Sequence, residues 1–178
     1  MDQTFAKSDD PASKFYYSSP GDVDYTLVQT TDDGYAIAGT SGNHNFWMIK
    51  VNSQGQLLWS KTYMQTNSGY AFALLHSMTK TSDGGFALAG AMETSEDAED
   101  FLIVKVDSQG NELWSKTYNS GTYPDSSGEL PRYDEATAVI QTRDGGYAIL
   151  GQTTTYARAP AKCSSLFEAH VGYPHFPL

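Results

Sequence analysis

The sequence contains one cysteine, few basic residues and no long apolar run. Among its 178 residues 21 are acidic and 11 are Lys or Arg, so the formal net charge is −10 at pH 7. Such a chain repels nucleic-acid phosphates and anionic membrane surfaces, and no cluster of basic residues offers a local exception. A single Cys163 excludes an internal disulfide. Without a run of about 18 apolar residues, no segment is predicted to insert into a membrane.

Recognisable catalytic and ligand-binding patterns are also missing. The four histidines lack metal-site spacing, and we find no nucleophile elbow, phosphate-binding glycine loop or isolated carboxylate pair. We therefore assign no catalytic residue, no cofactor and no metal ligand, and a non-enzyme is favoured. The N-terminal residues MDQTFAKSDDP are polar and acidic, so they are not a signal peptide.

An internal repeat dominates the sequence. FLIVKVDSQGNELWSKTY at 101–118 is a near-copy of FWMIKVNSQGQLLWSKTY at 46–63. In each copy a β-branched apolar run meets a polar Ser-Gln-Gly turn, and an alternating strand with one Trp then returns, which predicts a hairpin. A long unit repeated in this way indicates a repeat architecture.

A second hairpin recurs three times along the chain. The turns Asp32-Asp33-Gly34, Asp83-Gly84-Gly85 and Asp144-Gly145-Gly146 each join two short apolar strands. Glycine accepts positive φ at little cost, so we predict that Gly85 and Gly146 hold such a conformation. Gly34, Gly85 and Gly146 are thus structural repeat positions.

Each complete unit is predicted to contain four antiparallel strands. The first unit spans 25–63, with strands at about 25–30, 34–40, 45–52 and 56–63. The second spans 74–118, with strands at about 74–81, 85–91, 100–107 and 111–118. A partial third unit, 136–156, has two clear strands.

The two ends of the chain depart from this pattern. Within the segment 1–24, Ser13-Lys14-Phe15-Tyr16 echoes the SKTY ending of the complete units, which predicts a lone outer strand. Phe5-Ala6-Lys7 is a rival alignment. Residues 157–178 are predicted to form an irregular tail. An alternative prediction is that Leu166–Gly172 forms a degenerate third strand.

The repeat resembles a known family. The segment TSDGGFALAG…DFLIVKVDSQGNELWSKTY is similar to the blade repeats of large secreted bacterial and archaeal β-propeller proteins, over about residues 22–153. It is distantly similar to quinoprotein-like blades, in which a Gly-x-x-x-Trp segment docks one blade on the next. Gly110 to Trp114 and Gly55 to Trp59 fit that spacing, but Asp107 lies one residue closer to the glycine, so the likeness implies architecture and no quinone chemistry.

The predicted fold is therefore all-β, with consecutive four-stranded antiparallel propeller blades. The family implies about six to eight blades in a closed ring, whereas this chain supplies about two and a half to three. An open arc leaves apolar faces at its two ends, as in Leu27 and Ile37 of the first unit and Ile140 of the third. We expect an associating or incomplete chain.

The three tryptophans could stack on sugars or pack in the core. Trp59 and Trp114 occupy equivalent repeat positions, which favours packing between blades. Trp47 aligns with Leu102 and is also predicted to pack.

An acidic stretch is the best candidate for binding a cation or a partner. It comprises Glu93, Glu96, Asp97, Glu99 and Asp100. The competing interpretation, a solvated loop tip, is favoured.

The functional hypothesis is a non-catalytic structural or binding module of a larger secreted or cell-surface propeller. A self-associating subunit that completes its ring is the alternative, and a propeller-fold enzyme such as a glycosidase carries least weight. The implied partners are other blades, a further copy, or a protein or carbohydrate ligand. The extracellular location rests on the resemblance, and the cytoplasm remains an alternative.

Overall fold

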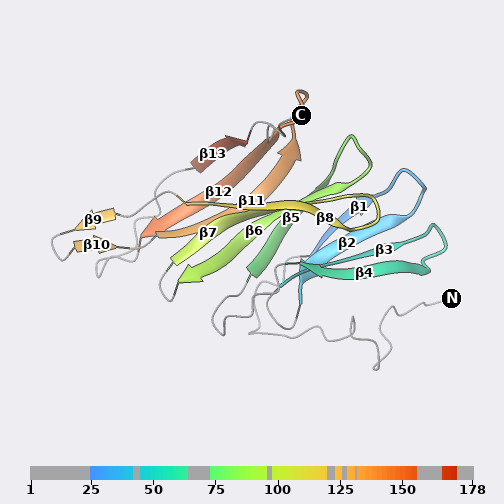
Figure 1. The fold of residues 1–178 in the computed structure, drawn as a ribbon, viewed down its shortest axis with the longest axis horizontal. Coiled ribbons are helices and arrows are strands. Elements are labelled where there is room, and N and C mark those ends of the chain that lie inside the picture. Colours follow the sequence, from blue (N-terminus) through green and yellow to red (C-terminus); the bar gives the residue numbers. More distant parts are fainter. Residues whose placement is uncertain are drawn as a thin grey trace.

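Every regular element that the structure describes is a β-strand. The structure, a computed structural model, describes residues 25–41, 45–63, 73–95, 98–119, 123–125, 128–130, 132–155 and 166–171 (Figure 1). These residues contain no helix, and hence none that is long and apolar enough to cross a membrane. The all-β prediction is confirmed. The predicted lone strand at 13–16 lies outside the described residues.

The first unit is a four-stranded antiparallel meander. It is formed by β1 (Thr26–Gln29), β2 (Tyr35–Thr40), β3 (Phe46–Val51) and β4 (Leu57–Tyr63). The strands pair in chain order, and the third and fourth have a register shift at Lys50/Val51. The four predicted strands are all present.

The second unit repeats this arrangement with longer inner strands. It is formed by β5 (Ala73–Lys80), β6 (Phe86–Ser95), β7 (Ala98–Val106) and β8 (Glu112–Tyr118). β7 and β8 shift register at Lys105/Val106, the position equivalent to the shift in the first unit. The repeated sequence thus produces the same local irregularity twice.

The third unit has three described strands. They are β11 (Arg132–Gln141), β12 (Tyr147–Thr155) and β13 (Leu166–Val171). β13 pairs antiparallel with β12, so this part of the predicted irregular tail is a strand, in agreement with the weighed alternative. A short hairpin of β9 (Tyr123–Asp125) and β10 (Gly128–Leu130), not predicted from the sequence, lies in the preceding connection.

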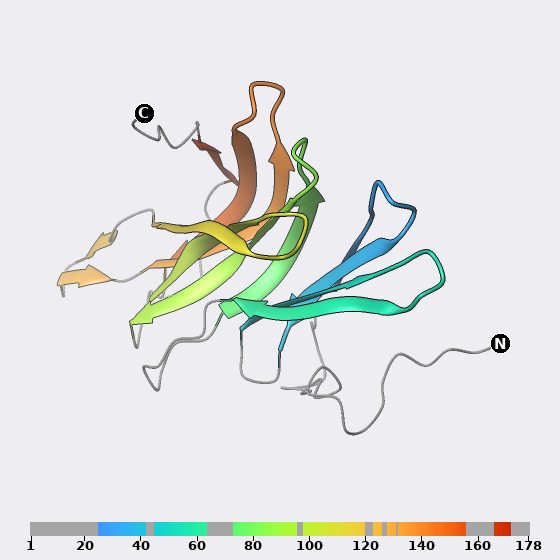
Figure 2. The same ribbon diagram turned by 45° about the vertical axis from the view of Figure 1, so that its right-hand side comes forward.

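The three units lie in a row, with the second between the other two (Figure 2). β5 packs over the strands of the first unit, and β11 packs over β5, β6 and β7. One parallel bridge, Tyr133 to Glu99, joins the second and third units into a single sheet, and the described strands do not close into a ring.

Each unit has two distinct faces. We call the side that packs on the preceding unit the front face, and the side that packs on the following unit the back face. At the first junction, front-face residues such as Leu88 and Val104 of the second unit join Ala38 and Met48 of the first in one buried cluster. At the second junction, Ala89 and Ile103 join Val139 and Ile149 in another.

The prediction for the turn glycines is wrong in position. Positive φ occurs one residue earlier, at Asp33, Gly84 and Gly145. Thr81 N–H donates to the Gly85 carbonyl and Gly84 N–H donates to the Thr81 carbonyl, so the loop holds three residues with the left-handed one last. Gly85 is needed for another reason: a Cβ there would collide with the carbonyl oxygen of Val106.

Candidate functional site

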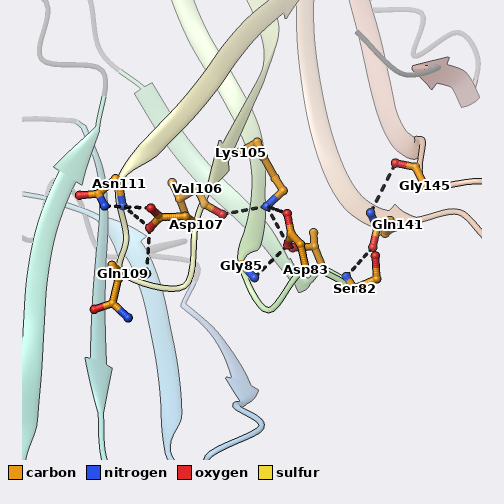
Figure 3. Close-up of polar contacts among 11 residues, drawn as sticks. Ser82, Asp83, Gly85, Lys105, Val106, Asp107, Gln109, Asn111, Gln141 and Gly145 are labelled. Atoms are coloured by element: carbon orange, nitrogen blue, oxygen red, sulfur yellow. Dashed lines mark hydrogen bonds and ion pairs between the residues drawn. The ribbon is translucent and has the colours of Figure 1, made fainter. Parts of the chain in front are cut away.

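A lysine anchors the turn in each of the first two units, partly buried in the first and fully buried in the second. Lys50 Nζ lies 2.8 Å from Asp32 Oδ2, and Lys105 Nζ lies 2.9 Å from Asp83 Oδ2 (Figure 3 shows the second pair). The Lys105 side chain is 4% exposed, and its Nζ also donates to the Val106 carbonyl oxygen. A lysine so buried requires its carboxylate.

The turn aspartates are held as anions by these contacts. Hydrogen bonds from Lys50 and then Thr30 lower the pKa of Asp32 to about 2. Burial would raise the pKa of Asp83, but hydrogen bonds from Thr81 and Lys105 outweigh it and lower the pKa to about 2. The recurring charges at these turns therefore hold the hairpins together, which is a structural use.

The second type of turn is closed by an Asx motif. Asp107 Oδ1 accepts hydrogen bonds from the N–H groups of Gln109 and Asn111, both at 2.8 Å (Figure 3). Asn52 makes the same contacts in the first unit, with the N–H groups of Gln54 and Gln56. Burial opposes ionisation of Asp107, but hydrogen bonds from Asn111 and Gln109 outweigh it and lower its pKa.

Trp59 contacts the turn of the next unit. A Cβ on Gly110 would lie 2.9 Å from the Trp59 ring, and Gly110 itself has φ of 74°. Tyr63 Oη donates to the Gly110 carbonyl oxygen at 3.0 Å, and Lys61 Nζ donates to Asn111 Oδ1 at 2.6 Å. The fourth strand of the first unit therefore docks on the last turn of the second.

Trp114 takes the equivalent place at the second junction but has a different partner. Its ring lies edge-on to Tyr147, with 5.6 Å between ring centroids, and Lys116 Nζ lies 5.8 Å from the Trp114 ring centroid. Trp59 and Trp114 are each partly buried against the apolar cluster of their junction. Trp47, predicted to pack, is 6% exposed.

The most unusual polar group lies at the second junction, at the strand ends opposite the turns. We call it the acidic cluster, and it contains His76, Glu93, Glu99 and Glu135. His76 Nε2 lies 2.7 Å from Glu135 Oε1, and Gln152 donates to Glu135 Oε2 at 2.6 Å. Glu93 pairs directly with Glu99 across β6 and β7. Three strands of the second unit and one of the third thus bring three carboxylates and one histidine together.

Glu99 and Glu135 of this cluster have opposite electrostatic environments. Burial, and then the charges of Glu135 and Glu93, raise the pKa of Glu99. The hydrogen bond from His76 lowers the pKa of Glu135. The two carboxylates therefore differ in the direction of their pKa shifts, because Glu135 accepts hydrogen bonds from His76 and Gln152 while burial and neighbouring carboxylates dominate at Glu99.

The residues of the predicted acidic stretch lie in different environments. Glu93 and Glu99 lie on strands that run further than expected and are half-buried, so for these two the favoured solvated loop is wrong, while Asp100 lies on β7 within the predicted strand. Glu96 and Asp97 lie outside the described residues. Asp134, fully buried beside the cluster, accepts a hydrogen bond from Thr153 Oγ1 at 2.6 Å.

His76 and Glu135 were not identified from the sequence as partners. His76 occupies the register shift between Leu75 and Ser77, and it lies on β5 while Glu135 lies on β11. No spacing rule in the sequence relates two residues of separate units. The pairing of His76 with Glu135 could therefore be recognised only once the packing of β11 over β5 was known. Within the described residues, no group of three or more His, Cys, Asp or Glu side chains has an arrangement that could hold a metal ion.

Comparison with known proteins adds no relative. No protein-family model matches the chain, and no curated protein matches it.

Proposed function

We propose that this chain is a non-catalytic module of consecutive β-propeller-type blades, whose role is to present or join binding surfaces. One observation carries the proposal: equivalent repeat positions meet equivalent neighbours at both junctions. Ala38 and Ala89, from the second strands, face the following unit, while Leu88 and Ile149 face the preceding one. A sequence that encodes the same junction twice is suited to a row of units.

The charged residues of the turns support the non-catalytic part of the proposal. Lys50 and Lys105 recur in register and contact the turn aspartates, so their charges serve the hairpins. The resemblance of the DGG…WSKTY repeat to secreted propeller proteins supports a secreted or cell-surface location and a larger parent protein. A protein or a carbohydrate is the ligand class that we propose for such a module.

The row of units is tested by hydrogen exchange. In a nearest-neighbour array, weakening the first junction should loosen the first unit and leave the third unit nearly unchanged. We expect Trp59→Ala to speed amide exchange in β1 to β4, with β11 and β12 retaining their protection. Equal loosening of all three units would show one cooperative sheet and would overturn the modular proposal.

The non-catalytic part is tested by a separate screen. The full chain is incubated with glycosidase and dehydrogenase substrates, and in parallel titrated with soluble polysaccharides by calorimetry. Binding without turnover, or the absence of both, agrees with the proposal. Turnover that survives purification and is lost in a Glu135→Gln variant would make the acidic cluster an active site, which is the enzyme alternative.

A further inference from the structure

The two ends of the row expose faces of opposite type. The first unit ends in a front face, which has no preceding described unit, and the third ends in a back face (Figure 2). On the front face of the first unit Leu27 is 60% exposed and Tyr35 is 40% exposed. On the back face of the third unit Ile140 is 59% exposed and Leu150 is 40% exposed.

The internal junctions show what each of these faces packs against. The front-face positions of Leu27 and Tyr35 correspond to Met78 and Phe86 in the second unit, which are 6% and 1% exposed. Those two side chains are buried against the back face of the first unit. The same positions in the third unit, Val139 and Tyr147, are buried against the back face of the second unit.

The first strand of a unit lies close against the preceding unit and supplies part of this docking. β5 packs over β1 and β2, and β11 packs over β5 and β6. In the first unit the equivalent strand is β1, and its outward Leu27 is exposed, whereas Ile49 and Val51 of β3 on the same face are buried. The exposed part of the front face is therefore the side of β1 and the start of β2, which is one of the parts that dock in the internal junctions, while the β3 side of the same face is already buried.

We propose that the back face of the third unit binds the front face of the first unit of a second copy, head to tail. The contact repeats the pairing of faces that the chain already makes twice, so a front face meets a back face rather than its own kind. Such a contact is heterologous: it uses Leu27 and Tyr35 from one copy, and Ile140 and Leu150 from the other. Leu150 stands where the first two units have Ala38 and Ala89, so we expect looser packing than at the internal junctions.

The inference rests on the proposed stacking of units, and the two can fail separately. The exchange measurement on Trp59→Ala tests the stacking inside one chain. Association between copies is tested by sedimentation equilibrium of the full chain up to about 100 µM, at about 0.15 M salt so that the net charge of −10 is screened. We expect the average mass to rise with concentration.

Two one-face variants test the direction of docking. Leu27→Glu removes the front contact and Ile140→Glu removes the back contact, and we expect each variant alone to associate at least tenfold more weakly than the wild type. Their equimolar mixture should form a dimer that does not grow further, because each variant retains the face that the other needs. Leu113→Glu, at a 53% exposed position on β8 of the middle unit, is the matched control and should associate like the wild type.

Three outcomes would overturn the proposal. The wild type could stay monomeric at every concentration, which would leave these faces to other units or partners. Either one-face variant could dimerise alone as well as the wild type, which would mean that like faces meet. The mixture could also fail to associate. Circular dichroism checks that each variant is folded, and Leu27→Ser with Ile140→Ser replaces the charged pair if one is not.

Discussion

The two junctions between units are alike in their apolar contacts and differ in their polar contacts. In both, small residues of a second strand and an aromatic residue of a third strand pack under the next unit, with Phe46 in the first junction and Phe101 in the second. The polar contacts of the first junction include those of β4, through Tyr63 and Lys61 to the turn of the second unit. Those of the second include the pair of His76 and Glu135 between first strands.

The reason for this difference lies in the third unit. The first junction uses the turn between β7 and β8, where Gly110 admits the Trp59 ring. Among the described residues, the third unit has no fourth strand and so no equivalent turn. Trp114 packs on Tyr147 instead. Apolar burial therefore sets the spacing of the units, while the polar contacts depend on which elements each unit has.

The largest expected effect is at the first junction, with Trp59→Ala. It removes a ring that packs on the buried cluster and on Gly110, and we expect a loss of about 3 kcal/mol in the free energy of unfolding, at the low end for a large-to-small core change because the ring is partly exposed. Urea unfolding measures this.

A double-mutant cycle sharpens that result. Gly110→Ala alone should be destabilising, because φ is 74° and the new Cβ would meet the Trp59 ring. In the Trp59→Ala background the collision disappears, so the cost of Gly110→Ala should fall by about 1 kcal/mol or more. Strict additivity of the two changes would contradict the docking of Trp59 on this turn.

A smaller loss is expected from Trp114→Ala at the second junction. The ring is partly buried and makes one edge-on aromatic contact, so we expect about 2 kcal/mol, below the value for Trp59→Ala. The two variants are compared by urea unfolding in the same buffer. If Trp114→Ala costs more than Trp59→Ala, the contact with Gly110 is not what separates the junctions.

The strands and turns could be predicted because their signals are local. Alternating apolar residues and the DGG and SQG turns place the strands of the first two units to within a few residues. The left-handed residue of the DGG turn was misplaced by one position. That sequence fits both a two-residue and a three-residue loop, and only the pairing of Thr81 with Gly85 decides between them.

The acidic cluster could not be predicted because it depends on packing between units. Glu99 lies near Glu135 because β11 runs alongside β7 at the Tyr133–Glu99 bridge. The sequence identifies Glu93 and Glu99 as part of an acidic stretch, but the favoured interpretation places both side chains in a solvent-exposed loop. The strands extend through this stretch, as the pairing of Glu93 with Glu99 shows.

The next prediction isolates one polar contact of the first junction. Tyr63→Phe removes the hydrogen bond to the Gly110 carbonyl but retains the ring, and should cost about 1 kcal/mol because a buried acceptor loses its donor. Burial, and then the charges of Asp107 and Glu112, raise the pKa of Tyr63, so the wild-type hydroxyl remains a donor up to strongly alkaline pH. The corresponding Tyr118→Phe in the second unit is the comparison, and an equal loss there would show that the bond to Gly110 is not special.

The smallest expected effect concerns Glu99 at the second junction, and it depends on pH. The pKa of Glu99 is raised above 4.5 in the folded protein, first by burial and then by Glu135 and Glu93. A folded-state pKa above the unfolded value means that the protonated form favours folding: this stabilisation is complete below pH 4.5 and is lost as the pH rises through the folded pKa. Glu99→Gln keeps the shape of the neutral side chain, so at pH 7 it should stabilise the protein by up to about 1 kcal/mol, the small size reflecting solvent screening of a half-buried group.

The pH profile separates this electrostatic origin from a packing effect. The gain from Glu99→Gln should shrink as the pH falls and vanish below about pH 4.5, where the wild-type Glu99 is itself protonated. Glu112→Gln, at an exposed position on β8 away from the cluster, should show no such gain. A gain of the same size at pH 4 and pH 7 would mean that the charge of Glu99 does not destabilise the folded protein. The second junction would then differ from the first only in its partners for Trp114 and His76.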